Sequence, residues 1–125
     1  MTDLGRRIRI KRVYEPASPG DGTRILVDRL WPRGLTKADA AVALWLKEIA
    51  PSSILRKWFH QDAGRWEVFR DRYRAELHLR RELLEELLAT ARAGPLTLVY
   101  AARDPLHNHA AVLREVLVEE ARKRA

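Results

Sequence analysis

The chain contains no cysteine, which excludes disulfide bonds, thiolate catalysis and cysteine-ligated metals. It has no apolar run approaching the ~18 residues that a membrane-spanning helix needs. Basic side chains in segment 1–12 are not followed by a hydrophobic stretch, so this segment does not resemble a signal peptide. These absences predict a cytoplasmic protein with no membrane partner.

The sequence also lacks the short motifs that would define a reaction. Gly20 and Gly22 belong to a turn and do not form a glycine-rich phosphate loop. There is no Walker lysine, no G-x-S-x-G nucleophile motif and no carboxylate cluster suited to calcium or magnesium. The sequence therefore leaves any cofactor unknown, and it does not decide whether the protein is an enzyme.

The composition is that of a globular protein, with 46% hydrophobic and 33% charged residues in a chain of 125. This length favours a single domain over 1–125. The net charge is +7, and the basic excess lies in residues 1–33, which hold eight basic and four acidic side chains. A basic N-terminal third suits an anionic partner, including nucleic acid, although solubility alone explains it equally well.

Three segments are predicted to be strands. Residues 8–14 alternate apolar and basic side chains, whereas 24–30 and 96–101 contain apolar runs typical of buried strands. Helical sequence separates the two buried strands, and more follows the last one, which favours parallel pairing. We therefore expect an α/β fold: a small, mostly parallel sheet of three or more strands packed with several helices.

Most of the remaining sequence predicts helices. Thr36 is suited to cap a helix that begins near Lys37 and continues to about Leu46. A second helix is expected after the Ser52–Ser53 pair, and others across 83–91 and after the last strand. The clearest helix spans 64–78, where four apolar residues recur at helical spacing: Trp66, Phe69, Tyr73 and Leu77. Trp45, Trp58 and Trp66 are expected in the core.

Two polar motifs follow the two buried strands. DRLWPRG occupies 28–34, and AARDPLHNH occupies 101–109. Ligands of open parallel sheets bind outside the carboxyl ends of the strands. The sequence therefore predicts that both motifs contribute to one ligand site at this edge of the sheet.

Arginines are the clearest binding candidates in these motifs. Arg29, Arg33 and Arg103 lie on or near the strand ends. A guanidinium presents a planar fork of donors that matches phosphate or carboxylate, so their convergence would make an anion site. The alternative is that each arginine pairs with Asp28 or Asp104 and braces its loop.

His60, Asp104 and His107 are the candidates for proton transfer, since imidazole titrates near neutrality. Asp104 followed by Pro105 also suits an N-cap and a first helical position. A haem or metal site through His60 or His107 is a weaker hypothesis. His107 and His109 are two residues apart at an expected helix start, so they point in different directions.

Trp31 and Asn108 each allow two interpretations. Trp31 stands between two arginines in a loop, where it could line a pocket or stack on a flat ligand, or else plug the sheet edge. Asn108 could hydrogen-bond a ligand or satisfy loop backbone. We include both among the predicted ligand-binding residues.

Several long motifs occur in an order that resembles the YeaO-like family, domain of unknown function 488. The resemblance covers nearly the whole chain. Its motifs are KRVY at 11–14, VDRLWPRG at 27–34, LWLKEIAPS at 44–52, LRKWF at 55–59 with His60, W-x-x-F-x-x-x-Y at 66–73 and YAARD-x-x-H-N at 100–108. The resemblance implies a compact α/β domain with several helices and no established activity.

The preferred hypothesis from the sequence is a site for an anionic small molecule, nucleotide- or phosphate-like, with or without catalysis. The alternative is nucleic-acid binding through the basic N-terminal third. Substrate, reaction and oligomeric state do not follow from the sequence.

Overall fold

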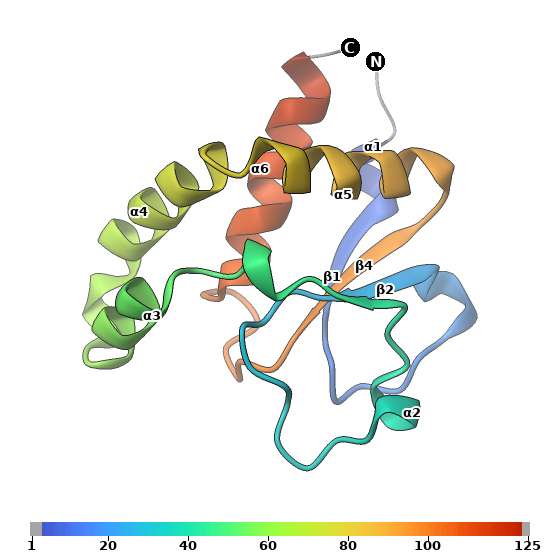
Figure 1. Cartoon of the computed structure of the whole chain (residues 1–125), viewed down its shortest axis with the longest axis horizontal. Coiled ribbons are helices and arrows are strands. Elements are labelled where there is room, and N and C mark those ends of the chain that lie inside the picture. Colours follow the sequence, from blue (N-terminus) through green and yellow to red (C-terminus); the bar gives the residue numbers. More distant parts are fainter. Residues whose placement is uncertain (1–3, 124–125) are drawn as a thin grey trace.

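A computed structural model describes residues 4–123, which form a four-stranded parallel sheet beside six α-helices (Figure 1). The strand order is β1-β4-β2-β3. The strands are β1 (Ile8–Arg12), β2 (Thr23–Leu26), β3 (Leu44–Trp45) and β4 (Leu96–Tyr100). The α/β fold with a small parallel sheet, predicted from the sequence, is confirmed.

β4 lies between β1 and β2, and this position explains its uniformly apolar or uncharged sequence. All five of its residues are buried, because strands pair with both of its edges and helices cover the sheet. In β1, Ile8 is buried while Arg9 is exposed, which is the alternation of a strand with one solvated face.

The helices divide unequally between the faces of the sheet. They are α1 (Leu4–Arg7), α2 (Lys37–Ala40), α3 (Ser53–His60), α4 (Trp66–His78), α5 (Arg81–Ala93) and α6 (His109–Lys123). α6 packs on β1 and β4, and α4 packs on α6, so one face carries the main core. The opposite face has a smaller cluster: Val13, Leu26, Ala40 and Val99.

The predicted helix from Lys37 to Leu46 is wrong at its C-terminal end. Thr36 does cap α2, accepting the Asp39 amide at 3.0 Å, but the helix stops at Ala40. Ala41 adopts a left-handed conformation, with φ of 51°, which no α-helix continues. The chain then extends and pairs as β3 at the edge of the sheet.

Trp45 was expected in the core, and this expectation is also wrong. It lies on edge strand β3 and is 36% exposed. Its indole nitrogen donates to the backbone oxygen of Asp28 at 2.7 Å, and its ring packs edge-on against Trp31 at 5.5 Å. Trp45 thus supports the loop after β2 from outside the core.

No helix within 4–123 is long and apolar enough to cross a membrane.

Candidate functional site

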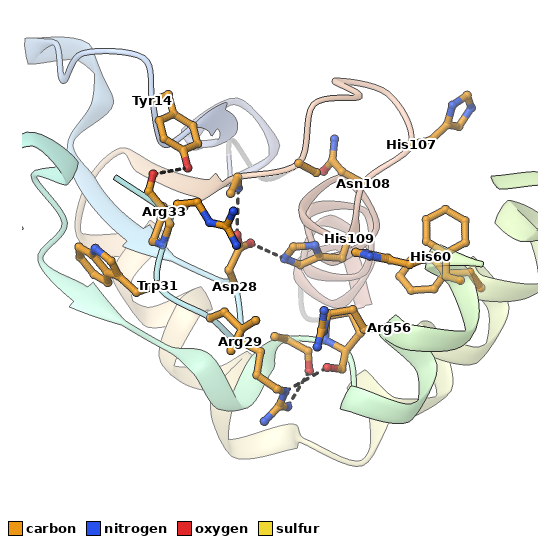
Figure 2. Close-up of a pocket in the computed structure, with 18 residues that line it drawn as sticks. Tyr14, Asp28, Arg29, Trp31, Arg33, Arg56, His60, His107, Asn108 and His109 are labelled. Carbon is orange, nitrogen blue, oxygen red and sulfur yellow. Dashed lines mark hydrogen bonds and ion pairs between the residues drawn. The ribbon is translucent and has the colours of Figure 1, made fainter. Parts of the chain in front are cut away.

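A pocket of about 420 Å³ opens at the carboxyl ends of β2 and β4 (Figure 2). Three segments form most of its wall: the loop after β2, the loop after β4, and helix α3 with the residues just before it; Tyr14, after β1, and Phe69 of α4 also line it. The structure therefore places parts of both polar motifs on one pocket. Its lining includes six of the eight predicted site residues: Arg29, Trp31, Arg33, His60, His107 and Asn108.

Asp28 lies at the centre of the pocket (Figure 2). Its Oδ2 accepts the Ala101 amide at 2.9 Å, which joins the two loops. Its Oδ1 lies 2.9 Å from Nε2 of His109, but that nitrogen is also 3.0 Å from the backbone oxygen of Val27. Both oxygens can only accept, and of the two contacts only the one to the Val27 oxygen has hydrogen-bond geometry, so the Nε2 hydrogen is directed to Val27. Asp28 Oδ1 is consequently buried without a well-aligned hydrogen-bond donor among the described residues.

Arg56 enters the pocket from α3 (Figure 2). Its Nε is buried and has no hydrogen-bond partner within 4–123, and its guanidinium forms no ion pair there. The sequence reasoning did not select Arg56. The sequence feature that could have identified Arg56 is its position four residues before His60, because this spacing puts both side chains on one face of a helix.

The three predicted arginines have different surroundings. Arg29 donates to the backbone oxygens of Pro51 (3.2 Å) and Ala50 (3.3 Å), so it braces the loop against the segment before α3. Arg33 lines the pocket, and in the part of the chain described its guanidinium pairs with no carboxylate. Figure 2 shows its side chain directed toward Asp28. Arg103 is exposed and does not line the pocket.

Asp104 and His107 form an exposed turn at the rim. Asp104 Oδ1 accepts the amides of Leu106 (2.9 Å) and His107 (3.1 Å), and Oδ2 lies 3.1 Å from His107 Nδ1. The two backbone hydrogen bonds are the main reason that the pKa of Asp104 is lowered. Figure 2 shows His107 pointing away from Asp28, and its ring packs edge-on against Trp66.

The predicted helix start at Asp104 and Pro105 is wrong, because α6 begins at His109. Asn108 caps it instead: its Oδ1 accepts the Ala111 amide at 2.9 Å, and its Nδ2 donates to the Asp104 backbone oxygen at 2.9 Å. Asn108 is 3% exposed, and these two hydrogen bonds satisfy its side-chain oxygen and nitrogen, so its role is structural.

His60 and Trp31 complete the predicted set. His60 is exposed at the pocket, packs edge-on against Phe59 and has no hydrogen-bond partner among residues 4–123. Trp31 donates its indole hydrogen to the Leu35 backbone oxygen at 2.6 Å, so it stabilises the loop as well as lining the pocket.

Metal chemistry finds no support at the histidines. Within the described chain, no three histidine, aspartate or glutamate side chains are arranged to hold a metal ion. His109, the most enclosed histidine of the pocket, packs against Tyr73 and contacts Asp28. Burial raises the pKa of the Tyr73 hydroxyl, which donates to the Ile49 backbone oxygen at 2.8 Å.

The fold and the pocket define a small parallel α/β domain with a polar cavity at its strand ends. A family model described as "Inactive DUF488-N3 subclade" matches residues 7–125. The chain is 49% identical over 110 residues to "Uncharacterized protein YeaO" of Escherichia coli K12, covering 88% of this chain and 96% of that protein. It is 45% identical over 111 residues to "Uncharacterized protein Rv3073c" of Mycobacterium tuberculosis H37Rv, covering 89% and 93%.

These similarities confirm the resemblance seen in the motifs: the chain belongs to the YeaO-like family of domain of unknown function 488. No solved structure matches it significantly.

Proposed function

We propose that this protein binds a small organic anion in the pocket at the strand ends and does not transform it. The observation that carries this proposal is Arg56, which lines the pocket and whose buried Nε has no hydrogen-bond partner among the described residues. A buried donor without a partner costs ~1–3 kcal/mol. A phosphate or carboxylate would accept from the guanidinium and remove that cost.

The rest of the pocket supports the same kind of ligand. Arg33 and His60 add a second guanidinium and an imidazole. Phe59 and Phe69, whose rings stack at 4.4 Å, supply an apolar wall. A volume of about 420 Å³ lies in the range of small-molecule sites. The lining therefore suits an anion that also carries a flat apolar group.

Binding without catalysis is favoured by the state of the proton-transfer candidates. Asp104 does orient the His107 imidazole, at 3.1 Å, but both residues are exposed at the rim and His107 points away from Asp28 (Figure 2). His60 has no neighbour within the described chain that orients its imidazole by a hydrogen bond. A general base is ordinarily held by such a partner. The description of the matching subclade as inactive agrees with a binding role.

Calorimetric titration with inorganic phosphate and AMP tests the proposal. Arg56→Gln should weaken binding of both by about tenfold or more, because a charged hydrogen bond contributes ~1.5–3 kcal/mol. The affinity of Arg56→Lys should lie between those of the wild-type protein and Arg56→Gln, since an ammonium keeps the charge but lacks the planar fork of donors. Arg92→Gln, which removes an exposed charge from α5, serves as the matched control. Unchanged binding by Arg56→Gln would contradict the proposal.

A second candidate function is nucleic-acid binding at a different surface. A shallow hollow between α1, β1 and α6 is lined by four arginines: Arg6, Arg9, Arg114 and Arg122. Arg114 donates to the backbone oxygens of Ile8 and Gly5, whereas the other three are exposed. This surface lies in part in the basic N-terminal third and suits phosphate backbone rather than a specific base.

A further inference from the structure

Asp28 gives the pocket a second kind of recognition, and this inference depends on the proposed anion site. One carboxylate oxygen, Oδ2, accepts the Ala101 amide at 2.9 Å. The other, Oδ1, is buried and lacks an aligned donor because the His109 hydrogen is directed to the Val27 backbone oxygen. Two residues that line the pocket thus each keep a buried atom without a hydrogen-bond partner within 4–123: the acceptor Oδ1 of Asp28, which has only the close contact to His109 Nε2 at 2.9 Å, and the donor Nε of Arg56.

The two residues line different walls of the same cavity. Asp28 follows β2, and Arg56 lies on α3 (Figure 2). No ion pair joins Asp28 to Arg33 or Arg56 in the described structure, so these opposite charges do not satisfy each other. Unpaired buried polar groups are rare in native proteins. Their meeting in one cavity indicates a ligand that supplies an acceptor to Arg56 and a donor to Asp28.

We propose that the ligand is an amino-substituted heterocycle that carries a phosphate, of the chemical class of AMP and CMP. Its phosphate accepts from Arg56 and Arg33, and its amino group donates to Asp28 Oδ1. Its ring lies against the wall formed by Phe59 and Phe69. An otherwise equal ligand with a carbonyl in place of the amino group would set oxygen against oxygen at Asp28.

Two matched pairs of nucleotides test this inference: AMP against IMP, and CMP against UMP. Each pair differs at the base essentially by an amino group replaced by a carbonyl. Calorimetry on the wild-type protein should show at least one amino member binding about tenfold or more tightly than its partner, because an unmatched buried acceptor is penalised strongly.

Asp28→Asn supplies the sharper test. Its side-chain oxygen still accepts the Ala101 amide, and its NH2 group then faces the pocket as a donor. The preference should reverse in favour of the oxo member, IMP or UMP. Phosphate binding should persist, since Arg56 is unchanged. A thermal melt verifies that the variant is folded; if it is not folded, the wild-type preference alone decides the inference.

The two proposals fail in different ways. Equal binding of amino and oxo members, a preference for the oxo member, or an unchanged preference in Asp28→Asn would overturn the role of Asp28. If nucleotides still bind and require Arg56, the anion site itself stands. If neither phosphate nor any of the four nucleotides binds, both proposals are wrong.

Discussion

Two aspartates show how differently single residues can be placed in this fold. Asp21 is 4% exposed and accepts from Lys11 (3.0 Å), Arg24 (2.9 Å) and Ser18 (2.9 Å). Burial raises the pKa of Asp21, but these hydrogen bonds together outweigh it and hold the pKa well below the ordinary carboxyl value. Asp28, by contrast, keeps one oxygen without an aligned donor among the described residues. The first carboxylate is structural, and the second is the one we assign to a ligand.

Asp21→Asn should destabilise the protein by ~3 kcal/mol, because it leaves the Arg24 guanidinium buried beside a neutral group. The measurement is urea unfolding at pH 7. The pKa is lowered in the folded state, so the stabilisation is present above the unfolded value, about 4, and is lost as the pH falls below it.

Unfolding repeated from pH 6 down to pH 2 checks that sign. Wild-type stability should decline more steeply than that of Asp21→Asn in the acid range. Parallel curves for the two proteins would show that Asp21 has no lowered pKa.

Individual site residues were only partly predictable. Arg33 and His60 were selected because they follow a strand or stand in a recognisable motif, and both line the pocket. Arg56 was missed because its importance arises from lacking a partner, which depends on tertiary contacts. The hydrogen bonds of Arg29 could not be predicted from the sequence either, since its acceptors, Ala50 and Pro51, lie more than twenty positions away.

At the level of elements, α3 carries Arg56 and His60, and Ser52 fixes where it begins. Ser52 Oγ accepts the Leu55 amide at 3.2 Å and donates to Glu76 at 2.6 Å. The Ser52 amide donates to the other Glu76 oxygen at 2.8 Å. This cap therefore both starts α3 and attaches it to α4.

Ser52→Ala should reduce stability by ~1 kcal/mol through loss of the cap, measured by urea unfolding. It should also weaken phosphate binding severalfold in calorimetry, because α3 is no longer held in one orientation. Thr36→Ala is the matched control: it removes the cap of α2, away from the pocket lining, and should leave phosphate affinity unchanged. Equal effects of both variants on affinity would contradict a positioning role for Ser52.

The sequence predicted helices and strands well where a pattern of apolar residues extended over a whole element. The stripe over 64–78 became α4, and the apolar run over 96–101 became β4. The prediction from sequence failed where one or two residues decide whether a segment is helix or strand. The left-handed conformation of Ala41 ends α2, and pairing with β2 makes a strand of Leu44–Trp45. Neither is encoded in local periodicity.

At the scale of the whole molecule, we expect the hollow between α1, β1 and α6 to bind DNA independently of the pocket. Affinity for a generic DNA duplex should fall steeply with salt, because such binding releases counterions. The triple variant with Arg6, Arg9 and Arg122 changed to Gln should reduce both affinity and salt slope in fluorescence anisotropy. Arg56→Gln should leave DNA binding unchanged. DNA binding lost in Arg56→Gln would show that the two surfaces are not independent.

The position of the pocket follows from the order of the strands in the sheet. The loops after β2 and β4 are brought together by the parallel sheet, and α3, which packs on α4, adds a third wall. The carboxyl ends of β2 and β4 are adjacent because the two strands pair directly. This adjacency follows from parallel pairing, which the alternation of strands and helices predicted.

The most direct test of the anion site is an NMR titration of the 15N-labelled protein with phosphate and with AMP. We predict amide shift changes concentrated in three segments, 28–33, 50–60 and 101–109, and their loss in Arg56→Gln. Shift changes of equal size in Arg56→Gln, or changes confined to the surface of Arg6, Arg9 and Arg122, would contradict the account.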